Sequence, residues 1–147
     1  MALPEPNRAD AEAGLELLQE TYRLEPRGLQ VIRVAGGYRM ATRPEYDRHL
    51  RALYRQRNRH RLGRAALETL AVIAYRQPVM RAEIEAIRGV KAGPILRTLL
   101  DHRMVKMVGR ADVPGRPLQY GTTQHFLETF GLESLSDLPS VKEFRQL

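Results

Sequence analysis

The order of local sequence patterns most constrains the fold of this 147-residue chain, because one order occurs twice. In the first half, Leu15, Leu18 and Tyr22 recur at helical spacing. Two short β-type runs follow, GLQVIRV and YRMAT, separated by Gly36-Gly37, which can supply the positive φ angles of a tight hairpin turn. A spacing of four residues then predicts another helix: Thr42, Tyr46 and Leu50 stand at i, i+4 and i+8.

The second half repeats this order. Residues 94–102 carry four apolar residues on one predicted helical face: Ile95, Leu96, Leu99 and Leu100. The β-type runs MVKMVG and LQYGT follow, and alternation predicts that Val105 and Met107 point inward. A last helical spacing comes after them: Thr122, Phe126 and Phe130. Helix, hairpin and short helix are therefore predicted twice.

Two further helices are predicted ahead of the second copy. Residues 64–75 place an apolar stripe along one face: Ala66, Leu70, Ile73 and Ala74. Residues 81–89 form a short helix with Ile84 and Ile87 inward and Gly89 just past its end. Pro94 opens the next helix. This order is typical of a winged helix, for which 63–139 suffices, whereas the first copy, at about 50 residues, is short of helices and marginal alone.

Charge is concentrated in one stretch of a basic chain. The net charge is +7, and eight of the arginines but only two acidic residues lie in 43–64. Such a strip favours either a solvated helix and linker or non-specific contact with nucleic acid. The second interpretation names five residues: Arg51, Arg55, Arg57, Arg59 and Arg61.

The residue composition argues against a disulfide-bonded, a secreted or a membrane-spanning protein. The chain has no cysteine, which excludes disulfides and thiolate metal sites and suits a reducing cytosol. The first 20 residues contain five acidic residues and no long apolar run, so we expect neither a signal peptide nor a membrane span. We therefore expect a soluble, intracellular chain.

No catalytic or cofactor motif is found. The loop GRADVPGRPLQY, residues 109–120, lacks the Gly-Lys-Ser/Thr of a phosphate loop, so we interpret it as a rigid hairpin tip. The four histidines have no partners at metal-ligand spacing: His49, His60, His102 and His125. His125 and Glu128 could mimic an acid–base pair, but a surface contact is the favoured interpretation. We expect no enzyme, no metal and no cofactor.

DNA binding is the alternative function. The helix 94–102 would enter the major groove, and its outward positions are Arg97, Thr98, Asp101 and His102. One arginine opposed by one aspartate reads bases poorly, because the carboxylate repels phosphates. A transcriptional regulator of the MarR type is therefore the second hypothesis.

Four segments carry a family resemblance. ALETLAVIAYRQPVMRAEIEAIRGV (66–90), VGRADVPGRPLQYGTT (108–123) and FLETFGLESLSDLP (126–139) resemble segregation and condensation protein B, and VIRVAGGYRMATRPEY (31–46) looks like the end of that family's first domain. The resemblance implies a mainly α, α+β chain with two tandem winged-helix domains. The implied division is an incomplete, N-terminally truncated domain at 1–50, an Arg-rich linker at 51–62, a second domain at 63–139 and a tail at 140–147.

The resemblance also implies a function. Members are non-enzymatic subunits that bind a kleisin, segregation and condensation protein A (ScpA), which bridges the ATPase heads of the SMC protein that organises and separates bacterial chromosomes. It implies a homodimer through the N-terminal domains, a cytoplasmic, nucleoid-associated location, and DNA contact that is indirect or weak. The residues that we expect to contact the kleisin are Arg110, Pro114, Arg116, Pro117 and Tyr120, followed by Tyr75, Arg76 and Pro78.

Three departures from the family pattern carry expectations of their own. MALPEPNRAD stands where the family has an apolar segment with a GEP turn. Met80 replaces a Ser or Thr, so the helix that follows loses a capping hydroxyl, at a cost of roughly 1 kcal/mol. Arg103 replaces a common Gly, which creates local strain where φ is positive.

Overall fold

The structure is a computed structural model that describes residues 7–25, 27–54 and 62–140. The chain divides into two compact units, Met1–Arg59 and His60–Leu147, and each is described by itself. Both combine helices with antiparallel strands, and helix predominates, so the chain is a mainly α, α+β protein as predicted.

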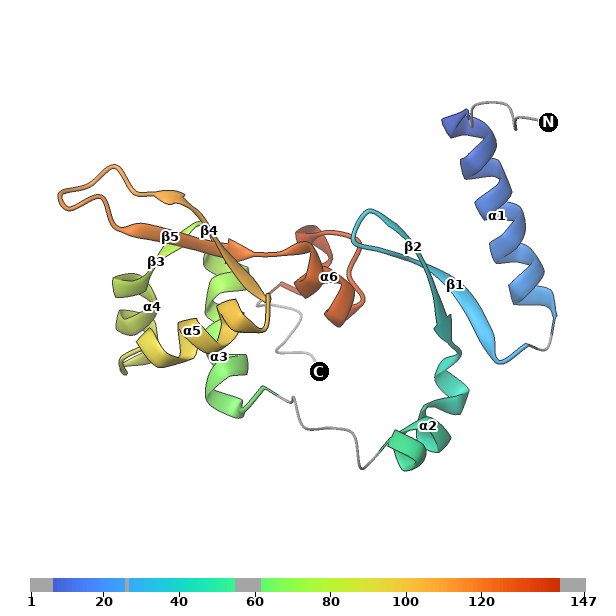
Figure 1. The fold of residues 1–147 in the computed structure, drawn as a ribbon, viewed down its shortest axis with the longest axis horizontal. Coiled ribbons are helices and arrows are strands. Elements are labelled where there is room, and N and C mark those ends of the chain that lie inside the picture. Colours follow the sequence, from blue (N-terminus) through green and yellow to red (C-terminus); the bar gives the residue numbers. More distant parts are fainter. Residues whose placement is uncertain (1–6, 26, 55–61, 141–147) are drawn as a thin grey trace. The chain divides into compact units, whose positions relative to one another are not determined.

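The first unit is a long helix, a hairpin and a short helix (Figure 1). Its elements are α1 (Arg8–Leu24), β1 (Leu29–Val34), β2 (Gly37–Thr42), the 3-10 turn η1 (Pro44–Tyr46) and α2 (Asp47–Tyr54). The carbonyl groups at the end of α1 are satisfied by Arg43, whose Nη2 donates to the oxygens of Tyr22, of Arg23 at 3.2 Å and of Glu25 at 3.1 Å. This arginine therefore ties the end of α1 to the chain that leaves the hairpin.

Two predictions for this hairpin are wrong in detail. Val34 pairs with Gly37, so the two-residue turn is Ala35-Gly36, with φ angles of 51° and 74°, and not Gly36-Gly37. Thr42 ends strand β2 and does not begin a helix, because Leu29 pairs with it and extends the ladder to that residue. The helical segment therefore begins after Thr42, with η1 and α2.

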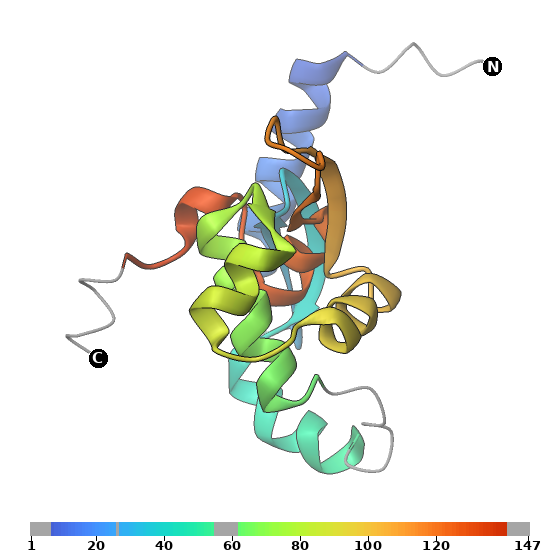
Figure 2. The ribbon, with the colours of Figure 1, turned by 90° about the vertical axis from the view of Figure 1, so that its left-hand side faces the viewer.

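The second unit is three helices, a three-stranded sheet and a fourth, short helix (Figures 1 and 2). Its elements are α3 (Arg64–Arg76), β3 (Val79–Met80), α4 (Arg81–Arg88), α5 (Gly93–Asp101), β4 (Val105–Arg110), β5 (Leu118–Thr122), α6 (Gln124–Phe130) and the 3-10 turn η2 (Leu135–Asp137). The strand order is β3-β5-β4, all antiparallel.

The core of this unit lies where the helices meet. Leu70, Ile73, Ile84 and Leu99 are each at most 2% exposed. The predicted stripe of α3 is confirmed, because all four of its members are buried. On α5, Leu96 joins the core, while Ile95 and Leu100 pack against it partly buried.

The inward position predicted for Ile87 is wrong, because this side chain is 53% exposed. The next position on the inner side of α4 belongs to Arg88, four residues after Ile84. The Arg88 side chain is 13% exposed, and its guanidinium donates to three groups of α3: the Ala65 oxygen at 2.7 Å, the Thr69 hydroxyl and the Glu68 carboxylate at 2.8 Å. The hydrogen-bonded Arg88 side chain therefore joins α4 to α3, where the sequence pattern predicts a second buried apolar side chain.

Strand β4 leaves the core after its first residue. Val105 is buried as predicted, but Met107 is 57% exposed, so that second prediction is wrong. The β4–β5 hairpin extends past the helices (Figure 1), and its register shifts between Met107 and Gly109 at a bulge. Thr122, which the sequence pattern places in the last helix, instead ends β5. Thr123 caps α6, because its hydroxyl accepts a hydrogen bond from the Phe126 N–H at 3.2 Å.

The side chain of Gln77 joins the end of α3 to β5. Its Oε1 accepts the Thr122 N–H at 2.7 Å, while its Nε2 donates to the Thr122 hydroxyl at 3.0 Å and to the Ala74 oxygen at 3.2 Å. Gly121 permits this contact, because a Cβ there would lie 2.9 Å from both Gln77 Oε1 and Val108 Cγ1.

Gly121→Ala is expected to lower the free energy of unfolding of the second unit by about 1–3 kcal/mol, because the added methyl displaces Gln77 or Val108. The measurement is the midpoint of urea unfolding. Gly109→Ala is the matched control, since it places the same methyl in the same hairpin with no atom within 4 Å. Equal midpoints for the two variants would contradict the argument.

Two of the predicted departures have structural consequences. Arg103 has φ of 55°, so the condition on which the expected local strain depends is met. Met80 is the N-cap of α4 and makes no side-chain capping bond, although its N–H donates to Glu83 Oε2 at 2.7 Å. The reciprocal half of a capping box is therefore missing.

Met80→Thr is expected to raise the free energy of unfolding by about 1 kcal/mol, because the new hydroxyl accepts the Glu83 N–H. Met80→Val is the control, since it has the same shape as threonine and no hydroxyl. Thermal unfolding of both variants distinguishes the cap from the change in side-chain volume. A valine variant as stable as the threonine variant would show that the hydroxyl contributes nothing.

Candidate partner-binding surface

The eight residues predicted to contact a partner lie on separate surfaces of the second unit. The hairpin tip carries Arg110, Pro114 and Arg116. Pro117, just before β5, and Tyr120 on β5 line a groove beside α4. The third group, Tyr75, Arg76 and Pro78, surrounds the end of α3. The structure therefore does not bring all eight residues into one site.

The hairpin tip is held by its own hydrogen bonds. Arg110 Nη1 donates to the Arg116 oxygen at 3.0 Å, across the loop. The Ala111 N–H donates to the Pro117 oxygen at 2.9 Å, and the Arg116 N–H donates to the Val113 oxygen at 2.9 Å. The tip is therefore an ordered, exposed loop, and the Arg110 side chain helps to shape it.

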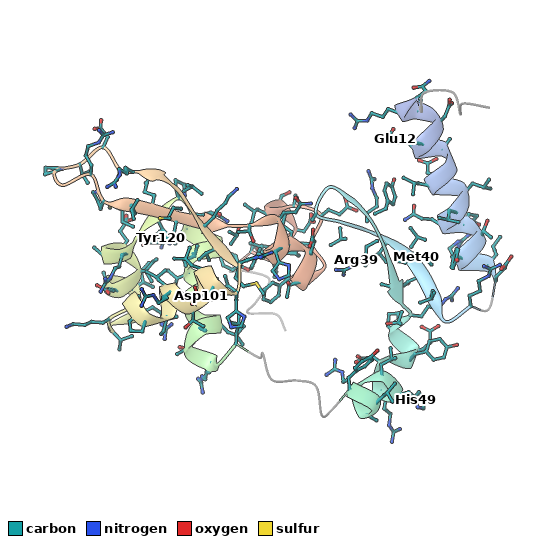
Figure 3. The ribbon with its side chains drawn as sticks, viewed as in Figure 1. Glu12, Arg39, Met40, His49, Asp101 and Tyr120 are labelled. Carbon is teal, nitrogen blue, oxygen red and sulfur yellow. The ribbon has the colours of Figure 1, made fainter. Side chains whose placement is uncertain are left out.

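A groove lies between α4 and the hairpin, and we call it the α4–hairpin groove. Its volume is about 360 Å³, and it is lined by Arg81, Ala82, Glu85, Pro117, Leu118 and Tyr120. Tyr120 is partly buried against the core, on the side of β5 that faces α4 (Figure 3). Tyr120 therefore packs inward and also lines the groove.

The acidic group in this groove is ionised and paired. Glu85 Oε1 accepts the Ala92 N–H at 2.8 Å and Arg81 Nε at 2.8 Å. The hydrogen bond from the Ala92 backbone, followed by that from Arg81, lowers the pKa of the Glu85 carboxyl below its usual value. The carboxylate fastens α4 to the turn before α5, so its role is to hold the helices together.

A second, more apolar groove lies beside α3, and sequence reasoning missed it. The α3–α6 groove has a volume of about 330 Å³. Its walls are Leu67, Ala71, Tyr75, Phe130, Leu132 and Leu138. The Tyr75 hydroxyl donates to the Pro139 oxygen at 2.7 Å. Of the eight residues predicted to contact a partner, only Tyr75 lines this groove. The sequence signal from which the groove could have been found is the set of apolar positions in FLETFGLESLSDLP.

Pro78 and Arg76 lie apart from Tyr75. Pro78 follows a cis peptide bond from Gln77 and lines a shallow hollow of about 340 Å³ with Val108 and Leu135. Arg76 is exposed in the last turn of α3, where its positive charge suits the negative end of the helix dipole.

The residues considered for nucleic-acid contact are only partly described. Arg51 is exposed on α2, and its Nε donates to Asp47 Oδ2 at 2.6 Å, which raises the pKa of the guanidinium. Arg55, Arg57, Arg59 and Arg61 lie outside the described residues. On α5, Arg97 and Asp101 are both exposed, as the sequence predicts.

Within residues 7–25, 27–54 and 62–140, no group of three or more histidine and acidic side chains is placed to hold a metal ion. His125 Nδ1 lies 3.7 Å from Glu128 Oε2 on the exposed side of α6, a surface contact. No helix in the described part of the chain has the length and apolar character needed to cross a membrane.

Comparison with known proteins identifies relatives along nearly the whole chain. A family model described as "Segregation and condensation complex subunit ScpB" matches residues 2–141. Segregation and condensation protein B of Syntrophotalea carbinolica is 53% identical over 130 residues, covering 88% of this chain and 66% of the relative. The protein of the same name from Moorella thermoacetica is 56% identical over 126 residues, covering 86% and 64%.

A solved structure is similar as well. The crystal structure of ScpB from Mycobacterium tuberculosis is 38% identical with a TM-score of 0.48, and the match covers 87% of this chain and 79% of that chain. The chain spans about two thirds of the length of the curated relatives, 66% and 64% in the two named above. The family match over residues 2–141 and these identities establish that the chain belongs to the segregation and condensation protein B family.

Proposed function

We propose that this chain is a non-enzymatic subunit of an SMC–kleisin complex, in which it binds the kleisin ScpA and takes part in chromosome condensation and partition. The observation that supports this is the family match over residues 2–141. The SMC ATPase heads are reached through the kleisin, and DNA contact is indirect or weak. The site of action is the nucleoid.

The proposed architecture is two tandem winged-helix domains. The divisions are a first domain at 1–50, a linker at 51–62, a second domain at 63–139 and a tail at 140–147. The second unit supports this, because α3, α4 and α5 are followed by the β4–β5 hairpin, the order of a winged helix. The hairpin is then the wing.

The proposed kleisin surface is centred on the hairpin. Strand β4 forms an edge of the sheet, so its outer backbone groups can pair with an added strand of the partner. The ordered tip lowers the entropy that is lost on binding, since its hydrogen bonds already fix the loop. Pro114 and Arg116 supply side chains at the tip, Pro117 and Tyr120 supply side chains in the adjoining α4–hairpin groove, and Arg110 shapes the tip.

The proposed homodimer through the first unit is supported by its exposed apolar side chains. Leu17, Leu24 and Leu53 are 69%, 71% and 75% exposed, and Met40 on β2 is 50% exposed (Figure 3). Among the described residues of this unit only Val34 is buried. Such apolar exposure is typical of a surface that a second chain covers.

A DNA-binding regulator of the MarR type is not favoured. The family match points elsewhere, and the exposed face of α5 places Asp101 one helical turn from Arg97. A carboxylate there repels the phosphates that the arginine would approach.

The kleisin proposal predicts that this chain and the central segment of its cognate ScpA co-elute on size exclusion at tens of micromolar. Arg116→Glu is expected to weaken the complex about tenfold or more, that is, about 1.4 kcal/mol, by placing a negative charge on the hairpin tip. Arg97→Glu is the control, because it makes the same charge change on exposed α5. Fluorescence anisotropy of a labelled ScpA segment gives the Kd.

No co-elution of the unchanged chain would overturn the kleisin proposal. Weakening by Arg97→Glu with none by Arg116→Glu would instead move the contact to α5.

The dimer proposal predicts a dimer mass in sedimentation velocity and a monomer mass for Leu17→Glu with Leu24→Glu. The two leucines are seven residues apart on one side of α1, so burying charges there is costly. Ala11→Glu, an exposed position around the helix from Leu17, is the control and is expected to remain dimeric. A monomeric unchanged chain would refute the dimer.

A further inference from the structure

Strand β4 has a free side, and the backbone groups that face it follow from the hydrogen bonds of the sheet. In the described part of the chain β4 pairs only with β5, in the order β3-β5-β4 (Figure 1). The Thr123 N–H donates to the Met104 oxygen at 3.2 Å, so Met104 faces β5. Because bonding groups alternate along an antiparallel strand, Lys106 also faces β5, whereas the N–H and C=O of Met107 face the free side.

This free side is open to solvent, and it carries apolar side chains between cations. Every residue of β4 except Val105 is exposed. Met107 and Val108 are 57% and 46% exposed, although both are apolar. Lys106 precedes this pair, and Arg110 follows it after one glycine. An added strand would therefore meet two apolar side chains with a positive charge on either side.

The cations of the hairpin lack carboxylate partners. Four are exposed, and none makes an ion pair with another described residue: Arg103, Lys106, Arg110 and Arg116. Asp112 is the one acidic residue in 103–116, so that segment has four positive charges and one negative charge. Cations on an edge strand oppose its pairing with a second copy, because like charges would meet. The same cations favour an acidic strand.

We infer that the free side of β4 binds an extended, acidic segment of the kleisin, in which two apolar residues are flanked by acidic ones. This inference rests on the proposed function for the identity of the partner, and it adds the chemistry by which the partner is recognised. The backbone of Met107 bonds the added strand. The apolar side chains of the segment cover Met107 and Val108, and its carboxylates approach Lys106 and Arg110.

Unpaired cations would also attract the phosphates of a nucleic acid. A phosphate backbone would leave the apolar side chains of Met107 and Val108 uncovered, and it cannot continue the β-sheet. An acidic peptide satisfies the charges, the apolar pair and the open edge together. The structure therefore favours the peptide, and duplex DNA becomes an outcome of the test.

The first test uses synthetic peptides with the whole chain and does not depend on ScpA. The peptide TEVVET is expected to protect the Met107 amide from hydrogen exchange. The Lys106 amide, which already faces β5, is expected to stay unchanged. The control TKVVKT keeps the apolar pair and reverses the charges, so it should give no protection. TEGGET keeps the charges without the apolar pair and should bind several-fold more weakly than TEVVET.

The second test uses the labelled central segment of ScpA. Lys106→Glu is expected to weaken its binding about fivefold, because the new carboxylate faces those of the partner. Arg97→Glu is the matched control, since it makes the same charge change on exposed α5, and it should leave the Kd unchanged. Added salt should weaken binding by the unchanged chain more than binding by the Lys106→Glu variant. Circular dichroism of each variant checks that the fold is retained.

The outcomes separate this inference from the kleisin proposal. Equal protection of Met107 by TEVVET and TKVVKT would overturn the acidic chemistry. Protection by duplex DNA and not by TEVVET would overturn it in favour of a nucleic acid, and protection that rises with the concentration of the chain alone would overturn it in favour of a second copy. Co-elution of ScpA without protection of Met107, and without loss in Lys106→Glu, would overturn the inference and leave the kleisin proposal standing. Protection by TEVVET without co-elution of ScpA would refute the kleisin as partner and support the chemistry of the edge.

Discussion

The hydrogen bonds between Gln77 and Thr122 are the interaction on which the second unit depends. They join Gln77, the C-cap residue of α3, to Thr122, the last residue of β5, and Thr122 is only 8% exposed. The register of the sheet follows from this junction, because Val79, two residues after Gln77, pairs with Tyr120, two residues before Thr122. A partly buried amide that is hydrogen-bonded through both its oxygen and its nitrogen fixes direction as well as distance. The start of α4 and the course of the hairpin are set at the same point.

This junction explains why the predicted contact residues separate in space. Tyr75, Gln77 and Pro78 are close in sequence, yet the helix ends between them. Tyr75 is still helical and points to the α3–α6 groove, Gln77 points to β5, and Pro78 lies beside Val108. A helix end turns successive side chains to different surfaces, so a motif that is continuous in sequence contributes to several sites.

Much of the second unit could be predicted, because its patterns are local. The stripe of α3, the inner face of α5 and both long strands are seen in the sequence as spacing. The inward positions predicted for Ile87 and Met107 were wrong, because periodicity does not reveal where an element leaves the core or where Arg88 replaces an apolar side chain. The α3–α6 groove could not be predicted for another reason. Leu67 and Phe130 are 63 positions apart in the sequence, and only the packing of α3 against the residues after α6 brings them together.

The two units differ in the source of their stability. The described residues of the second unit bury a cluster of twelve side chains, whereas α1 in the first unit buries none of its residues. Hydrogen bonds such as those of Arg43 give local order, but each contributes only about 1 kcal/mol net, and a small unit cannot offset its chain entropy with them alone. Under the proposed dimer, the exposed leucines of α1 would supply the missing apolar burial. Folding of the first unit would then be coupled to association by mass action, and its stability would rise with protein concentration, while that of the second unit would not.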